Sequence, residues 1–144
     1  MNIYSLSGRK EKRQLMAGDL REKTLSLIVP GAIRLKNNPL KVRLRKAQIE
    51  YEEAYRKWKT AARIWALCSI DSENLPFKDH CEVEARIYYG GKRFDLAEGL
   101  ESIGDCFEGV LWLDQKQIYS WEGSILIEDN DSPRLDIRIR WRSK

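Results

Sequence analysis

The chain is poor in the residues from which many catalytic and structural sites are built. It has three cysteines and one histidine among its 144 residues. Cys68, Cys81 and Cys106 stand far apart and form no Cys-x-x-Cys pair, so a disulfide framework and a structural zinc site are both disfavoured. The single histidine, His80, argues against catalysis that depends on histidine ligand sets or on a histidine triad.

Long apolar segments are missing as well. No run approaches the ~20 apolar residues that a membrane helix needs, and the polar N-terminal segment has no hydrophobic region typical of a secretory signal. We therefore expect a cytoplasmic protein without a membrane partner. The hydrophobic content of 42% suits one globular domain, which we place at residues 24–144 after a flexible basic arm of residues 1–23.

Charge is distributed unevenly along the chain. The net charge is +4, with a basic excess between residues 34 and 63 and more arginines near the C-terminus, whereas acidic residues gather between 82 and 131. Such a chain can hold a polyanion with its basic segments and a divalent cation with its acidic one. An ordinary solvated surface explains the same pattern and stays open as the alternative.

Hydrophobic periodicity predicts an α+β fold, a mixed β-sheet with one long and one short helix packed on one side. Strands are predicted at 24–31, 80–89, 123–127 and 135–141, and helices at 44–70 and 95–107. The long helix carries a stripe that includes Tyr51, Tyr55, Trp58 and Trp65, which we interpret as core rather than as a base-stacking surface. The loop before it is strongly basic.

The short helix raises the question of a metal site. Asp95, Glu98, Glu101 and Asp105 project from the side opposite its apolar stripe, and Asp114 follows the next apolar run. Mg²⁺ prefers hard oxygen ligands, and metal-assisted phosphodiester cleavage needs carboxylates that converge in space. Spacing alone does not distinguish such a site from a solvated acidic face.

The order of these features resembles the RusA-type Holliday-junction resolvases of bacteria and their phages. That family has a motif approximating D-x-D-N-x-x-K-x-x-x-D-A-L, then a glycine-led apolar turn and D-D-x-Q-I/V. The residues in step with the motif are Asp95, Asp105, Phe107, Gly109, Val110, Leu111, Asp114, Gln117 and Ile118. The resemblance covers roughly residues 24–142.

The resemblance implies a homodimer that nicks four-way DNA junctions with Mg²⁺ or Mn²⁺ in recombination and repair. On that basis we expect a magnesium-dependent endodeoxyribonuclease in a bacterial cytoplasm, or a phage protein in the host cytoplasm. The catalytic candidates are Asp95, Asp114, Glu98 and Glu101, and the metal-ligand candidates are Asp95, Asp114, Glu98 and Asp105.

Departures from the motif fall on its central positions. Ala97 and Glu98 stand where the family has aspartate and asparagine, Glu101 replaces the lysine, and Gln115 replaces the second aspartate of the D-D pair. A glutamate in place of a lysine adds negative charge where transition-state charge should be neutralised. Three readings follow: a junction endonuclease with a remodelled site, a catalytically impaired dimer that binds DNA junctions, or a protein-interaction factor with an acidic face.

Candidates for DNA binding come from the basic residues. Lysine and arginine neutralise backbone phosphates without reading base sequence. The candidates are Lys36, Lys41, Arg43, Arg45 and Lys46 in the basic loop, and Lys92, Arg93 and Lys116 around the acidic motif.

Overall fold

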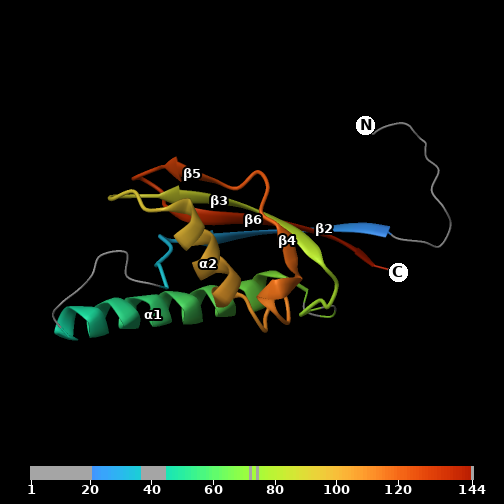
Figure 1. Ribbon diagram of the computed structural model, residues 1–144, viewed down its shortest axis with the longest axis horizontal. Coiled ribbons are helices and arrows are strands. Elements are labelled where there is room, and N and C mark those ends of the chain that lie inside the picture. The colour runs from blue at the N-terminus through green and yellow to red at the C-terminus, as the bar shows by residue number, and fades with distance from the viewer. Residues whose placement is uncertain (1–20, 37–44, 72, 74, 144) are drawn as a thin grey trace.

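The structure is a computed structural model that describes residues 21–36, 45–71, 73 and 75–143. The elements, in chain order, are β2 (Arg21–Pro30), α1 (Arg45–Ser69), β3 (Cys81–Tyr89), α2 (Leu96–Cys106), the 3-10 turn η2 (Gln115–Gln117), β4 (Ile118–Ser120), β5 (Ile125–Glu128) and β6 (Arg134–Ser143). Both helices lie on the same side of one mixed sheet (Figure 1). The predicted α+β class is thereby confirmed.

The sheet is built around β6, which pairs antiparallel with β2 on one side and with β3 on the other. Ile137 of β6 stands opposite Leu27 of β2 and Ala85 of β3, so one apolar row crosses three strands. Two short strands pair in parallel with β3: β4 at its beginning and β5 at its end. The sequence did not predict β4 or η2, and β2 begins earlier than the expected residue 24. The rest of the predicted arm, residues 1–20, lies outside the described residues.

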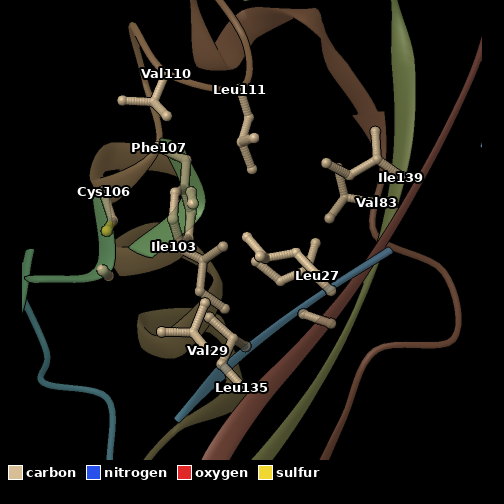
Figure 2. Close-up of a cluster of buried hydrophobic side chains, with 14 of the residues drawn as sticks. Leu27, Val29, Val83, Ile103, Cys106, Phe107, Val110, Leu111, Leu135 and Ile139 are labelled. Carbon is tan, nitrogen blue, oxygen red and sulfur yellow. The ribbon is translucent and has the colours of Figure 1, made fainter. Parts of the chain in front are cut away.

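The core fills the space between the sheet and the helices. Alternate side chains of β3 and β6 point toward the helices and are buried, as their period-two pattern predicts. Figure 2 shows Leu27 and Val29 of β2 close to Ile103 of α2, and Ile139 of β6 beside Val83 of β3, all within one buried cluster that also contains Phe107. Burying one such side chain stabilises the fold by about 1.5–3 kcal/mol. The short helix is therefore fixed to the sheet along its whole apolar stripe.

The other face of the sheet has no described layer over it. Most of its alternate residues are polar or charged, with the exposed Ile28 an exception, and some of them pair across strands: Arg140 Nη2 lies 3.5 Å from Glu82 Oε1, and the Tyr119 hydroxyl donates to Glu82 at 2.8 Å. Surface pairs of this kind contribute little stability. The outward-facing charged residues of β3 and β6 are therefore accounted for by exposure on this face, and they do not require a ligand.

The long helix packs on the sheet with part of its predicted stripe. Tyr55, Ala62 and Ala66 are buried. The prediction for Trp65 was wrong, because that side chain is 45% exposed and its Nε1 donates at 2.7 Å to the Ile28 carbonyl of β2, the outermost strand on that side of the described sheet. Neither α1 nor α2, the helices within the described ranges, has the length and apolarity that a membrane crossing would require.

Candidate functional site

Asp95 and Glu98 lie together at the start of α2. Asp95 is the N-cap, and its carboxylate accepts from the Ala97 N–H at 3.2 Å. Glu98 is in the first turn, where residues three apart are neighbours on the helix surface. Both side chains line the same cleft, described below. The positive end of the helix dipole favours carboxylates at this position.

Asp105, by contrast, is turned toward α1 and is held by protein partners. Its Oδ2 accepts from the Tyr55 hydroxyl at 2.6 Å and from Lys59 Nζ at 3.1 Å, and its Oδ1 lies 3.5 Å from Lys36 Nζ. Burial by itself would raise the pKa of Asp105, but the hydrogen bonds from Tyr55 and Lys59 and the charges of the two lysines hold it below 3.8. The carboxylate thus links α2 to α1. Both of its oxygens are engaged by protein side chains, whereas a metal ligand was expected to face the metal site.

Asp114 lies at the other end of α2, where it caps η2. Its carboxylate accepts from the Lys116 N–H at 2.8 Å, while the Gln117 side chain accepts from the Asp114 N–H at 2.9 Å in a capping box. Gln117 also donates to the carbonyls of Phe77 and Asp79, each at 2.9 Å. These bonds place Asp114 beside the segment that precedes β3.

Asp95 instead follows the end of β3, and the helix α2 separates it from Asp114. An 11-residue helix is about 16 Å long. The expected convergence of Asp95 and Asp114 on one metal ion is therefore not found within a single chain. Gln115, at the position of the second motif aspartate, packs against Gly104, where an added Cβ would lie 2.9 Å from the Gln115 amide oxygen.

The described residues do not fit the expected magnesium site. Among them there is no group of three or more His, Cys, Asp or Glu side chains that could hold a metal ion. Asp95 and Glu98 are adjacent, but Ala97 brings no oxygen between them and Asp105 is engaged elsewhere. Glu101, one turn further along α2, is exposed and does not line the cleft. We therefore derive no chemical step through a bound metal.

A cleft of about 710 Å³ lies between the segment after β2, the first half of α1, the end of β3 and the start of α2. Its lining residues are Ala32, Ile33, Arg34, Leu35, Tyr51, Ala54, Ile87, Tyr89, Gly90, Lys92, Arg93, Phe94, Asp95 and Glu98. They combine three cations, two carboxylates and three aromatic rings on an aliphatic floor. A volume of this size is typical of ligand-binding pockets, which span about 300–1,000 Å³.

One wall of the cleft is held in place at both of its ends. The Gly31 N–H donates to the Pro133 carbonyl at 3.0 Å, and the Lys36 N–H donates to Ser102 Oγ at 2.7 Å. Gly31 has a φ of 93°, a left-handed conformation that favours glycine. Ile33 and Leu35 between these anchors are buried. Arg34 alternates with these two buried residues and is exposed on the rim.

The opposite rim is the turn between β3 and α2. Gly91 has a φ of 76°, and its N–H donates to Asn130 Oδ1 in the β5–β6 turn at 2.9 Å. This bond fixes the backbone just before Lys92 and Arg93, which are exposed at the cleft. Phe94 then turns inward and meets Tyr89 edge-on, with ring centroids 5.9 Å apart.

The charges of the cleft act on one another. Burial raises the pKa of the Tyr51 hydroxyl, the charge of Glu98 raises it further, and the charge of Arg34 lowers it. Tyr51 on α1 thus lies within electrostatic range of Arg34 on one rim and of Glu98 at the start of α2. The cleft is a site of mixed charge in which cations stand at the rim and carboxylates at the start of α2.

The predicted DNA-binding residues fall in several places. Lys92 and Arg93 line the cleft, whereas Lys36 is engaged with Asp105. Lys116 is exposed on η2 beyond the far end of α2. Arg45 and Lys46 are exposed at the start of α1, and Lys41 and Arg43 lie outside the described residues.

Sequence reasoning missed Arg34, Tyr51, Tyr89 and Phe94 as members of one site. Tyr51 belongs to the stripe that periodicity assigns to the core. Tyr89 and Phe94 flank a Gly-Gly turn, which by its sequence indicates only a break between two elements. The useful signal was that turn, because it directly precedes Lys92, Arg93 and Asp95. No protein-family model and no curated protein matches this chain.

Proposed function

We propose that the protein binds DNA through this cleft and that binding, rather than phosphodiester cleavage, is its activity. The observation that carries the proposal is the placement of Arg34, Lys92 and Arg93 on two facing rims. Hydrogen bonds of backbone N–H groups anchor both rims, so the backbone that carries the cations is held in place before a ligand arrives. Cations on such rims can contact successive phosphates without reading base sequence.

The preference for branched DNA and the homodimeric state rest on the resemblance of residues 24–142 to RusA-type resolvases. Two observations favour the DNA-binding hypothesis over the nuclease hypothesis. The motif residues are replaced at Ala97 and Gln115, and Asp95 is separated from Asp114. Asp95 and Glu98 repel phosphates. We therefore expect the DNA backbone to follow the cationic rims and to leave the start of α2 uncovered by phosphate.

Binding is tested by fluorescence anisotropy with a four-way junction, a linear duplex and a single strand of matched length, across a salt series. The variant Arg34→Ala/Lys92→Ala/Arg93→Ala removes the rim cations. Each lost phosphate contact should reduce the slope of log K against log salt by about 0.9 on duplex DNA. We expect the slope to fall by about 2–3 and the affinity to fall for all sequences alike.

The matched control is Lys78→Ala/Arg138→Ala/Arg142→Ala, which removes the same charge from exposed positions outside the cleft. It should lose much less affinity than the rim variant. Equal losses in the two variants would mean that net charge, and not the cleft, binds DNA. No binding of any DNA structure at low salt would reject the proposal and favour a protein-interaction role for the acidic residues.

Cleavage is tested on the same junction with Mg²⁺ and Mn²⁺ over a wide concentration range. We expect binding without nicking. Nicking that disappears in Asp114→Asn would overturn the binding-only proposal in favour of a junction endonuclease, because Asp114 makes no contact with the cleft in a single chain.

A further inference from the structure

The interior of the cleft differs chemically from its rims. The cleft is also lined by the rings of Tyr51, Tyr89 and Phe94, which are half-buried where the cations are exposed, and by the fully buried Ile87. Phosphate groups bind weakly to such a surface, because aromatic rings carry no positive charge and few hydrogen-bond donors. A flat aromatic ligand such as a nucleobase binds it well, because stacking on a ring is favourable for any base.

Two of the three rings are packed against neighbouring side chains. Gly99 on α2 lets the helix approach so closely that an added Cβ would lie 2.9 Å from Ile87 Cδ1 and 3.1 Å from Phe94 Cε2. Phe94 is in turn set edge-on to Tyr89 at an interplanar angle of 69°. Packing thus restricts Phe94 and Tyr89, which reduces the conformational freedom that these two side chains would lose on binding.

The two carboxylates complete the set of partners. Asp95 and Glu98 stand beside the rings and provide acceptors for N–H groups. Amino groups and ring N–H groups on the edge of an unpaired nucleobase are such donors, whereas in a duplex its partner base occupies them. Arg34, Lys92 and Arg93 at the rims are placed for the phosphates attached to the same nucleotide.

We infer that the cleft takes one unpaired nucleotide of a DNA strand, with its base among the aromatic rings, its edge at the carboxylates and its phosphates at the cationic rims. This inference rests on the proposed function and specifies which part of DNA the same site recognises. A base that remains stacked and paired in a duplex cannot stack on the half-buried rings of the cleft, so the nucleotide must leave the stack. Bulges, gaps and open branch points contain nucleotides for which that step costs least.

The test compares three duplexes of one sequence: fully paired, with a single-nucleotide bulge of 2-aminopurine, and with an abasic bulge. All three carry nearly the same phosphate charge, so the rims contribute almost equally to each. We expect the 2-aminopurine bulge to bind roughly 5- to 150-fold more tightly than the abasic bulge, the range that corresponds to base–aromatic stacking. The 2-aminopurine emission should also change on binding.

Three variants test whether the effect arises in the cleft. Phe94→Leu keeps an apolar side chain and removes the ring, and should bring the ratio of the two bulge affinities close to one. The control Tyr119→Leu removes an aromatic ring that is 64% exposed and lies outside the cleft, and should leave the ratio unchanged. Glu98→Gln retains an acceptor but removes a charge that repels phosphate, so it should strengthen binding of the abasic bulge.

The outcomes separate this inference from the proposed function. Equal, salt-dependent binding of all three duplexes would overturn the inference and leave DNA binding by the rims intact. Failure of all three to bind at low salt would reject DNA binding itself. Tight binding of a free mononucleotide, combined with no preference for the base-containing bulge, would overturn DNA as the source of the nucleotide.

Discussion

A substitution at Asp105 tests whether this residue of the acidic motif stabilises the fold rather than binding a metal ion. The substitution Asp105→Asn keeps the shape of the side chain and an oxygen that can accept from Tyr55, but it removes the charge that faces Lys36 and Lys59. At pH 7 the loss should appear as a lower free energy of unfolding. A side-chain contact between α1 and α2 is being weakened, so the effect is expected even in a chain that binds no metal.

The magnitude follows from the contacts. A hydrogen bond to a charged group contributes about 1.5–3 kcal/mol and a neutral one about 0.5–1.5 kcal/mol, so the Tyr55 bond should lose about 1 kcal/mol. The Lys36 and Lys59 side chains are 40% and 31% exposed, and pairs of this kind contribute about 0.5 kcal/mol each. The expected total is about 2 kcal/mol.

The pH dependence has a definite sign. Because the pKa of Asp105 is lower in the folded protein than its ordinary value of 3.8, its stabilisation is fully present above that ordinary value. It is lost as the pH falls through the lowered pKa of the folded state. The difference between the two proteins should therefore be constant from about pH 5 to pH 8 and should shrink below about pH 4.

Urea unfolding followed by far-ultraviolet circular dichroism, in the presence of EDTA, measures this difference. With a slope of about 1–3 kcal/mol per molar urea, the midpoint should fall by about 1 M. The control Glu122→Gln removes an exposed carboxylate and should change stability by no more than about 0.5 kcal/mol. An unchanged midpoint, a difference that persists unaltered at pH 2, or one that requires Mg²⁺ would refute the reasoning.

Three further substitutions test the surroundings of the cleft. Gly99→Ala should lower stability by about 1–2 kcal/mol, measured by thermal unfolding, because its Cβ would overlap Ile87; a gain in stability would show that Ile87 moves aside freely. Ser102→Ala should cost about 1–3 kcal/mol in urea unfolding, since it leaves the Lys36 N–H without its acceptor, and an unaffected midpoint would contradict the anchoring role. Asp114→Ala should cost about 1 kcal/mol through loss of the cap and leave DNA affinity unchanged by anisotropy, whereas weaker DNA binding would place Asp114 at the interface.

The local elements of this protein follow from its sequence because each has a strong periodic signal. Strict alternation in β3 and β6 and the apolar stripe of α2 require one buried side, and the structure buries that side. The Gly-Gly turn before α2 and the N-cap position of Asp95 are likewise local features. Boundaries were less accurate, and the short β4 and η2 carry too few residues to show a period.

Tertiary structure decided the chemistry of the site. Glu98 and Asp105 were predicted to project from the same side of α2, yet their surroundings differ. Asp105 contacts Lys59 of α1, whereas Glu98 lines the cleft. Trp65 belonged to the apolar stripe by periodicity, yet it is 45% exposed and its Nε1 donates to the Ile28 carbonyl of β2. Periodicity specifies the direction of a side chain from its own element, not which element it meets.

The amino-acid sequence by itself thus determined the fold class, the order of the main elements and the position of the acidic motif on a short helix. Only the tertiary structure decided that Asp95 and Asp114 stand at opposite ends of that helix, and that Arg34 faces Lys92 and Arg93 across a cleft. The physical reason is distance along the chain. Local patterns arise from neighbouring residues, whereas a site is made by contacts between segments that only packing brings together.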